Sequence, residues 1–519
     1  MVSPRKNSTL SLIDELLAEQ SRLQTPVARF AATHSSDRAS TLTSQLIPLS
    51  LPKPGEQYAF EVDLDSCTGC KACVSACHAL NGLDEDEAWR DVGLITGGTH
   101  SAPYQQTVTT ACHHCADPGC LNGCPVLAYE KDPITGIVRH LDDQCIGCQY
   151  CVLKCPYDVP KYNERLGIVR KCDMCQQRLG AGEAPACVQA CPTHAIRIVT
   201  VTTHVNGDLK VDTSHFLPTA PDAATTQPVT RYITERVAPA NVLAADNAIL
   251  RPQHAHWPLV IMLSLMPLAV GTEVAALYLN NLNYPVSAFS TLLRVGWVAG
   301  ALGLMASVAH LGKPLRAWRI FLGWRKSWLS REAMVFGAWF PLASAALLYP
   351  IAVLPAVIVG CIGLFCSVMI YVDTHRRFWR MAQTGPRFLA GVISFAGAAL
   401  YASGVETKLA LIAFGVGTAI KLICDARVMR PLDQADEEDP LTQVLHSARL
   451  LNGPLRSVFG GRIVVALVTA IALPLLIAAG KLPPAAMWGM FIGAVISELT
   501  ERYLFFRAVD APKMPGAAA

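Results

Sequence analysis

The sequence carries little charge, and this limits the partners that it can have. Only 16% of its 519 residues are charged and the formal net charge is +3, which is too small to suggest a nucleic-acid partner. No Cys-x2-Cys-His motif occurs, so covalent c-type haem is not indicated. Residues 1–57 contain no long apolar run of the secretory type, so we expect an N-terminal extension without a signal peptide, either an amphipathic helix or a loosely ordered segment.

Cysteine is scarce outside one stretch. Of the 19 cysteines, sixteen fall into four groups of four, and only three lie elsewhere. The groups are Cys67, Cys70, Cys73 and Cys77; Cys112, Cys115, Cys120 and Cys124; Cys145, Cys148, Cys151 and Cys155; and Cys172, Cys175, Cys187 and Cys191.

The spacing within these groups predicts iron–sulfur clusters. The first and third groups read Cys-x2-Cys-x2-Cys-x3-Cys, the bacterial ferredoxin pattern, in which the fourth cysteine ligates a different cluster. Zinc sites with four cysteines use two separated Cys-x2-Cys pairs, and disulfide frameworks belong to short secreted chains. Sixteen thiolates at four per cluster therefore predict four 4Fe-4S clusters.

The composition changes near residue 257, which divides the chain into two main parts. Residues 58–200 open on the alternating sequence YAFEVDLD, and the strand-like sequences GIVRHLDDQ and AIRIVTV later flank cluster loops. These features predict an α+β ferredoxin-like four-cluster domain built as a duplicated unit. Residues 201–256 lack periodicity and are expected to be a linker or docking arm.

Long apolar segments fill residues 257–506 and predict an all-α polytopic membrane domain of about eight transmembrane helices, with seven or nine possible. The segments are 257–279, 289–309, 333–349, 356–372, 388–403, 409–424, 463–479 and 485–504. Several are shorter than the roughly 20 residues that a span needs, so their boundaries must extend into the flanks. Residues 507–519 form a C-terminal tail.

Most basic residues of the membrane half fall on the ferredoxin side of these eight spans. They are Lys313, Arg316, Arg319, Arg325, Lys326, Arg331, Arg376, Arg377, Arg380, Arg387, Arg427, Arg430, Arg449, Arg456 and Arg462. The opposite side has Lys408, Lys481 and, at its edge, Arg294. The positive-inside rule then predicts a protein of the bacterial cytoplasmic (inner) membrane with its ferredoxin domain in the cytoplasm. Alternatively, the basic face docks the ferredoxin domain or an acidic subunit.

Two ionisable residues lie at span ends on the ferredoxin side, His310 and Glu332. Quinol releases two protons with two electrons, so a quinol site needs proton acceptors near a terminal cluster. We expect His310 to bond a quinol oxygen and Glu332 to take the proton onward. An equally open alternative is that His310 caps a helix and Glu332 pairs with an arginine. Histidines are few inside the spans, so bis-histidine b-type haem is not expected.

Both halves resemble a known family. Residues 58–235 resemble the four-cluster iron–sulfur subunit of the dimethyl sulfoxide reductase class of molybdenum oxidoreductases, through DSCTGCKACVSACHALNGLDEDEAWR, ACHHCADPGCLNGCP, CIGCQYCVLKCPYDVPKYN, KCDMCQQRL and TQPVTRY. Residues 257–506 resemble that enzyme's eight-span membrane anchor, through HLGKPLRAWR and SWLSREA. The family usually keeps the two parts as separate chains, whereas here they are fused.

The resemblance implies how the cysteines are shared among clusters. The four implied sets are Cys67, Cys70, Cys73 and Cys191; Cys172, Cys175, Cys187 and Cys77; Cys112, Cys115, Cys120 and Cys155; and Cys145, Cys148, Cys151 and Cys124. It also implies that His310 and Glu332 serve a quinol site, and that a separate subunit carries bis-molybdopterin guanine dinucleotide.

We therefore expect an electron-transfer and anchor subunit that oxidises menaquinol or ubiquinol and supplies a molybdopterin subunit reducing an S-oxide or N-oxide. One alternative is electron flow in the opposite direction, in which the chain would reduce quinone with electrons from a donor-oxidising molybdoenzyme. Another is a redox-linked pump or sensor, which needs ionisable residues within several spans, and these are sparse in the sequence.

Overall fold

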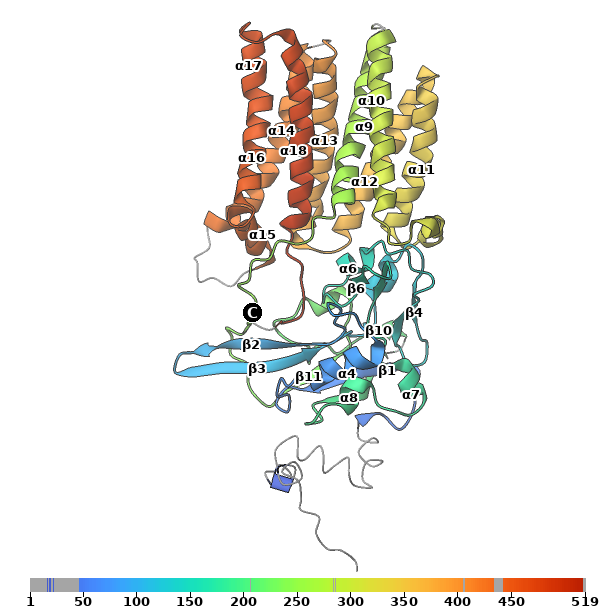
Figure 1. Ribbon diagram of the computed structural model, residues 1–519, viewed down its shortest axis with the longest axis vertical. Helices are drawn as coiled ribbons and strands as arrows, with labels where there is room; N and C mark the ends of the chain where they lie inside the picture. Colours follow the sequence, from blue (N-terminus) through green and yellow to red (C-terminus); the bar gives the residue numbers. More distant parts are fainter. Residues whose placement is uncertain are drawn as a thin grey trace, which may run out of the picture.

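A long helical bundle stands on a smaller α+β part that holds the cysteines (Figure 1). The computed structural model describes residues 46–516 except 206, 283, 285, 405–406 and 434–441, together with residues 16, 18, 19 and 22. The helix predicted near the N-terminus therefore lies almost wholly outside the described residues.

The α+β part is organised by β1 (Glu56–Asp63), which is the predicted strand YAFEVDLD. It pairs antiparallel with β8 (Ile196–Thr202), the predicted strand that follows the last cysteine group, and parallel with β11 (Arg231–Ile233). Strand pairing thus brings the two ends of the cysteine-rich stretch together. The same part contains the short helices α4 (Ala72–Asn81), α5 (Gly119–Gly123), α6 (Tyr150–Lys154), α7 (Gln176–Gly180) and α8 (Ala186–Gln189).

The remaining strands are short hairpins, except for one long hairpin that projects from the body (Figure 1). The long hairpin pairs β2 (Asp91–Thr99) with β3 (Ala102–Thr110). The short ones pair β4 (Tyr129–Lys131) with β5 (Val138–His140), β6 (Lys161–Asn163) with β7 (Ile168–Arg170), and β9 (His204–Val205) with β10 (Asp208–Leu209).

The segment predicted as a linker or docking arm, residues 201–256, is built into the α+β part. Its β11 extends the sheet of β1, and its β12 (Leu243–Ala244) pairs with β2 of the long hairpin. A single helical turn, η1 (Ala223–Thr225), precedes β11. The segment therefore runs along the cysteine-rich part before it enters the bundle.

The bundle begins with α9 (Trp257–Asn281), which packs against α10, α12, α13 and α18. Its residues are buried on most sides, as expected for the central helix of a bundle that is apolar all round. The other long helices are α10 (Val286–Ala309), α11 (Trp328–Ala346), α12 (Val353–Val372), α13 (Met381–Ala402), α14 (Thr407–Met429) and α18 (Met487–Arg507), and the consecutive α16 (Arg456–Leu467), η6 (Val468–Ala472) and α17 (Leu473–Ala478).

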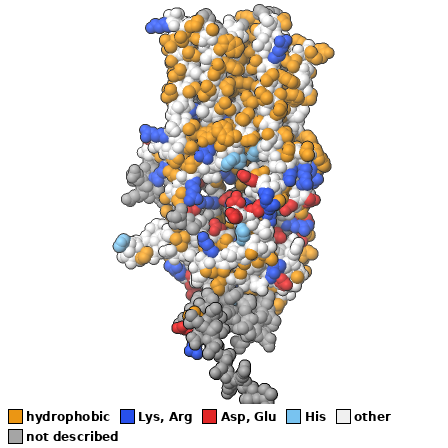
Figure 2. All heavy atoms as spheres, in the orientation of Figure 1, with side chains coloured by type: hydrophobic (Ala, Val, Ile, Leu, Met, Phe, Trp, Pro, Cys, Tyr) orange, Lys and Arg blue, Asp and Glu red, His pale blue; other side chains and the backbone are white. Residues whose placement is uncertain are grey.

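Among the described residues, five helices are long and apolar enough to cross a membrane. They cover Trp257–Asn281, Val286–Ala309, Pro350–Val372, Lys408–Asp433 and Arg456–Ala478. Helices α11, α13 and α18 lie alongside them in the bundle (Figure 1). Apolar side chains cover the visible face of the bundle, whereas charged side chains gather where it meets the cysteine-rich part (Figure 2). The chain is a multi-pass membrane protein.

Shorter elements lie between the long helices. They are η2 (Pro314–Gly323), η3 (Pro350–Ala352), η4 (Arg377–Trp379), η5 (Arg430–Asp433), α15 (Gln443–Asn452) and η7 (Pro484–Ala486).

A buried ionic network corrects the expectation that charges inside the bundle are sparse. Its members are Arg387 on α13, Lys421 and Asp425 on α14, Arg462 on α16, and Glu498, Glu501 and Arg502 on α18. Arg387 lies 2.9 Å from Asp425, and Arg462 lies 3.0 Å from Glu501. Arg387 and Arg462 are therefore buried ion-pair partners and not loop charges of the ferredoxin face. Pairing lowers the cost of burying each charge.

The C-terminal tail returns from the bundle to the α+β part. The Gly516 N–H donates to Asp246, the Leu94 N–H of β2 donates to the Gly516 carbonyl, and Lys513 pairs with Asp246. The tail thus ties the last helix to the long hairpin.

Candidate iron–sulfur sites and their junction with the anchor

The cysteine loops have a recurring backbone geometry. In the first group, Gly69 and Lys71 on either side of Cys70 have φ of 72° and 60°. In the third group, Gly147 and Gln149 on either side of Cys148 have φ of 69° and 59°. These left-handed residues turn the chain back on itself, so that closely spaced cysteines can face a common space.

One set of four cysteines lines a single cavity. Cys112, Cys115, Cys120 and Cys155 surround it, and they are the set that the resemblance implies for one cluster. No three His, Cys, Asp or Glu side chains among the described residues converge closely enough for a single ion. Cysteines spread around a cavity suit a cluster with several irons better than a lone zinc ion.

For the other three implied cysteine sets, the evidence is which cysteines lie close enough to interact electrostatically. Cys73 lies within electrostatic reach of Cys191, and Cys77 within reach of Cys175 and Cys187. Cys148 and Cys151 both lie near Cys124 and Cys145. The structure thus brings cysteines of different groups close together, including pairs that the resemblance assigns to one cluster. Cys73 also lies near Cys187 of another implied set, so the pairing stays a prediction.

Buried cations beside the cysteines fit a negatively charged cofactor. Arg90 is 2% exposed, stacks 4.6 Å from the Phe60 ring centroid and interacts electrostatically with Cys73 and Cys187. Two of its guanidinium nitrogens, Nε and one Nη, have no hydrogen-bond partner within the described residues. A buried cation without partners is costly unless negative charge lies nearby, and thiolate-ligated clusters supply it.

Lys171 is a second buried cation, and it lies between two of the implied cysteine sets, the one that contains Cys112 and the one that contains Cys172. It is 3% exposed, its Nζ lies 3.6 Å from Cys112 Sγ, and it donates to the carbonyl of Cys172 at 2.8 Å. Burial disfavours its charged ammonium, but the surrounding cysteine thiolates outweigh this effect and raise the pKa of Lys171. It therefore stays charged between Cys112, Cys120 and Cys172.

Burial makes several of these cysteines poor free thiolates. Burial raises the pKa of Cys77 to about 12, so this thiol stays protonated at neutral pH unless a metal replaces the proton. Backbone N–H groups donate to cysteine sulfurs, for example Ala128 to Cys124 at 3.2 Å and Gly147 to Cys145 at 3.3 Å. Such hydrogen bonds stabilise ligating sulfurs and tune cluster potentials.

The loop of the third cysteine group sits directly on the helical bundle. The Lys313 N–H donates to the Ile146 carbonyl at 3.0 Å, and Lys154 pairs with Asp373 at 2.9 Å. A Cβ on Gly167 would lie 2.6 Å from the Gly312 carbonyl oxygen, so glycines at 167 and 312 allow the two backbones to touch. Close packing therefore places Cys145, Cys148 and Cys151 nearest the anchor.

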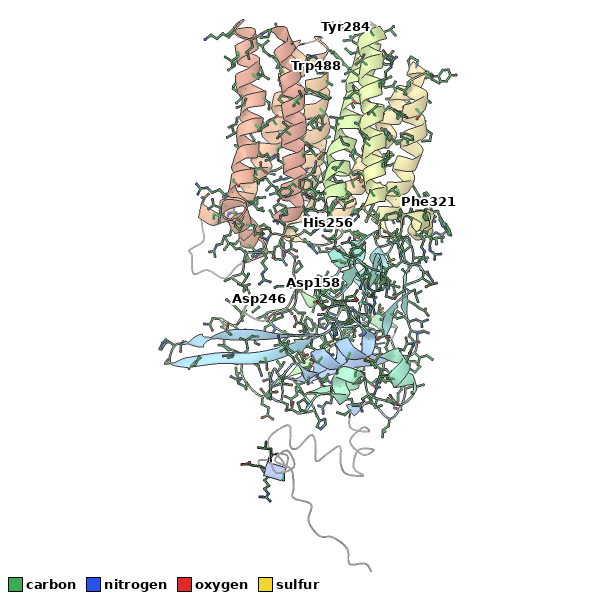
Figure 3. The ribbon with its side chains drawn as sticks, viewed as in Figure 1. Asp158, Asp246, His256, Tyr284, Phe321 and Trp488 are labelled. Atoms are coloured by element: carbon green, nitrogen blue, oxygen red, sulfur yellow. The ribbon has the colours of Figure 1, made fainter. Side chains whose placement is uncertain are left out.

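His310 lies at this junction, just after α10. Its imidazole forms a hydrogen bond with the backbone of Cys148, and its ring centroid lies 5.5 Å from that of His256. His256 lies where the bundle meets the cysteine-rich part (Figure 3). Burial lowers the pKa of His310, and the hydrogen bond to Cys148 opposes this effect. One ring nitrogen is thus engaged by the cysteine loop, and the other is left for a second partner.

Glu332 lies in the buried interior of α11, and its carboxylate accepts a hydrogen bond from Ser367 of α12. It does not pair with Arg331, which donates to the carbonyls of Trp324 and Arg325. No hydrogen bond joins His310 to Glu332 in the described part of the chain. The deeper Glu273 accepts from Trp339 at 3.1 Å, as expected for helix packing.

Aromatic rings connect the surroundings of these two residues. Tyr371 interacts electrostatically with Glu332, and its ring centroid lies 5.7 Å from that of Phe506. Phe506 in turn lies 5.5 Å from His256, the neighbour of His310. The structure thus brings both sequence-predicted residues to one end of the bundle without direct contact.

Comparison with known proteins finds matches to both halves of the chain. Family profiles match as a 4Fe-4S binding domain at residues 58–79, a 4Fe-4S dicluster domain at 104–201 and a DMSO reductase anchor subunit at 250–408. The B subunit of the anaerobic dimethyl sulfoxide reductase of Haemophilus influenzae is 39% identical over 150 residues, which are 27% of this chain and 73% of the relative. The chain belongs to the dimethyl sulfoxide reductase family.

Two further relatives show the breadth of the match. The B subunit of the Escherichia coli anaerobic dimethyl sulfoxide reductase is 38% identical over 148 residues, 27% of this chain and 72% of the relative. The Escherichia coli formate dehydrogenase-O iron–sulfur subunit is 35% identical over 162 residues, 28% of this chain and 54% of the relative. The chain is an iron–sulfur electron-transfer subunit of this family, fused to the family's membrane anchor.

Sequence reasoning missed the two buried cations, Arg90 and Lys171. Lys171 directly precedes Cys172, and a lysine adjoining a cysteine group is a signal that could have found it. Arg90 lies thirteen positions after Cys77, so only the fold reveals its contact with the cysteines.

Proposed function

We propose that this chain oxidises membrane quinol beside His310 and passes the electrons through four 4Fe-4S clusters to a molybdopterin-containing catalytic subunit. The hydrogen bond between His310 and the backbone of Cys148 carries this proposal. It puts a proton-accepting side chain against a cysteine loop at the face of the membrane domain. A quinol there would release its protons and electrons close to their acceptors.

His310 is suited to the proton side of this chemistry. With one ring nitrogen bonded to the Cys148 backbone, the other can accept a hydrogen bond from a quinol hydroxyl and then its proton. His256, which directly precedes α9, lies beside it with a ring centroid 5.5 Å away. The clusters, when bound by the four cysteine sets, supply one-electron transfer.

We propose for Glu332 a role other than taking the proton directly from His310. Its bond to Ser367 and its place behind Tyr371 favour a second, deeper proton-accepting position and not direct relay from His310. We propose that both residues border the quinol site from opposite sides of the aromatic cluster formed by Tyr371 and Phe506.

We also propose that eight helical segments cross the membrane, with the cysteine-rich part in the cytoplasm. Helices α11, α13 and α18 contain 19, 22 and 21 residues, close to the roughly 20 that a span needs. Tyr284 and Trp488 lie at the far end of the bundle, where aromatic side chains of membrane proteins meet headgroups (Figure 3). The exposed cations concentrate at the other end.

The test is purification of the chain from native membranes, with molybdenum analysis and a quinol-oxidation assay on the same sample. We expect a pterin subunit to copurify, and quinol oxidation to fall at least tenfold in His310→Ala, as for loss of a general base. Iron without molybdenum, with no quinol oxidation, would reject the proposal.

The reverse direction is a second candidate because one relative is named for formate dehydrogenase. In that case the chain would reduce quinone at the same site with electrons from a donor-oxidising subunit. Potentials of the clusters relative to the quinone, measured by redox titration, distinguish the two directions.

A further inference from the structure

The loop between α10 and α11 has an unusual three-residue repeat. Residues 315–326 read LRA, WRI, FLG, WRK, and Pro314–Gly323 form a ten-residue 3-10 helix. A 3-10 helix has three residues per turn, so positions three apart lie above one another, and runs beyond about four residues are uncommon. The repeat therefore places each kind of side chain on a separate face.

The first face is apolar and exposed. It carries Leu315, Trp318, Phe321 and Trp324, whose exposed fractions are 94%, 62%, 50% and 49%. Large apolar side chains at every turn form a continuous stripe that no part of the described chain covers. Phe321 lies at the outer edge of the molecule where the bundle meets the cysteine-rich part (Figure 3).

The second face is basic and lies next to this stripe. Arg316 and Arg319 occupy it together with Leu322, and Arg325 and Lys326 follow just after the helix ends at Gly323. Arg319 lies 5.6 Å from the Trp318 ring centroid and Arg325 lies 5.3 Å from that of Trp324. Each of these cations therefore lies against an exposed indole.

The third face, through Gly323, and two arginines of the basic face contact the cysteine-rich part. A Cβ on Gly323 would lie 2.5 Å from the Pro125 carbonyl oxygen, and Arg316 donates to the Asp143 carbonyl at 2.7 Å. Arg319 donates to Gln144 at 3.2 Å. The segment is thus held against the residues that precede Cys145, while its apolar stripe points away.

We propose that residues 313–326, the interfacial segment, bind the anionic phospholipid surface on the ferredoxin side of the membrane. Trp318, Phe321 and Trp324 would enter the boundary between headgroups and acyl chains, and Arg325 and Lys326 would bind lipid phosphates. Charge complementarity and position carry this assignment. Exposed indoles and cations alternate along the segment, and its Phe321 lies at the level where the apolar bundle ends (Figure 3). An acidic protein surface would match the cations but not the apolar stripe.

The test measures lipid binding and does not depend on quinol oxidation. Purified protein in a neutral detergent is titrated with phosphatidylglycerol or phosphatidylcholine, and bound lipid is counted by native mass spectrometry. The variant Arg325→Gln/Lys326→Gln removes two exposed cations that bind no cysteine loop. The matched control, Lys408→Gln/Lys481→Gln, removes the same charge from the opposite face.

We expect phosphatidylglycerol to bind about fivefold more weakly for each cation removed from the interfacial segment, and the control to bind as the wild type does. Equal binding by all three proteins, or an equal loss in both variants, would overturn the proposal. So would unchanged lipid binding with loss of the copurifying subunit, which would make the segment a protein-docking surface. Binding of phosphatidylglycerol to the wild type that does not weaken with added salt would also contradict the proposal. This outcome does not depend on whether the variants fold.

Discussion

Replacing Lys171 by methionine should lower the reduction potential of the clusters beside it. Methionine keeps most of the buried volume and removes the positive charge between Cys112, Cys120 and Cys172. A cation near a cluster stabilises the reduced form, which carries one more negative charge. Its removal therefore makes reduction less favourable.

The structure sets the size of this effect. Lys171 Nζ lies 3.6 Å from Cys112 Sγ. A unit charge at that distance is worth about 4–5 kcal/mol at an effective dielectric constant of about 20. Because the added electron is spread over a cluster and not held on one sulfur, we take about half, roughly 2 kcal/mol. For a one-electron couple this is about 90 mV, since about 59 mV corresponds to a tenfold change.

The assay is an anaerobic redox titration followed by electron paramagnetic resonance on the purified protein. Lys171→Arg keeps the charge and is the matched control, expected to titrate close to the wild type. The reasoning is refuted if the methionine variant retains its iron and no cluster shifts downward, or if both variants shift equally.

Three further predictions concern packing and pH. Gly312→Ala should cut quinol oxidation at least tenfold while the protein retains its iron, because a Cβ at this position meets the Gly167 backbone and separates the cysteine loop from the anchor. Gly337 has open space around it, so the control Gly337→Ala should leave quinol oxidation unchanged. Arg462→Met should lower the free energy of unfolding in detergent by about 3 kcal/mol, because it removes a cation that pairs with buried carboxylates. The same substitution at the exposed Arg456 of this helix is the control and should have little effect on that free energy. Burial disfavours the His446 imidazolium, but the carboxylate of Asp510 in the tail, 3.1 Å away, outweighs this effect and raises the pKa of His446. Docking of the tail should therefore weaken as pH rises through that raised pKa. Proteolysis of the tail at pH 6 and 8 measures this, and His446→Ala should remove the difference.

The sequence predicted local features well where spacing reflects chemistry. Cysteine spacing indicated the cluster sites, and alternation identified β1 and β8 before their pairing was known. The apolar segments marked the long helices, with ends displaced outward by up to seven residues, as for Phe388 against the helix start at Met381. Hydropathy cannot locate such ends because polar residues near headgroups remain helical.

Features that depend on contacts between distant segments could not be predicted. Arg387 and Arg462 looked like loop cations in the sequence, but the fold brings Asp425 and Glu501 to them from other helices. Segment 201–256 lacked any periodicity, yet β11 and β12 form because neighbouring strands offer unpaired edges. Long-range partners of this kind leave no periodic signal in the local sequence.

The position of His310 and Glu332 at the ferredoxin end of the bundle was predicted from the sequence, and their role at a quinol site stays a prediction. The contact of His310 with Cys148 depends on how the two parts dock, and the place of Glu332 beside Tyr371 depends on how α11 packs against α12. That docking rests on small residues such as Gly312, whose importance is visible only beside the opposing backbone.

The most direct test of the proposed function is reduction of the clusters by quinol in the purified protein alone. A reduced menaquinone analogue is added anaerobically, and cluster reduction is followed by electron paramagnetic resonance in the wild type and in His310→Ala. We predict that quinol reduces the wild-type clusters and that the variant is reduced at least tenfold more slowly, although dithionite reduces both fully. Equal rates of reduction by quinol in the two proteins would contradict electron entry beside His310.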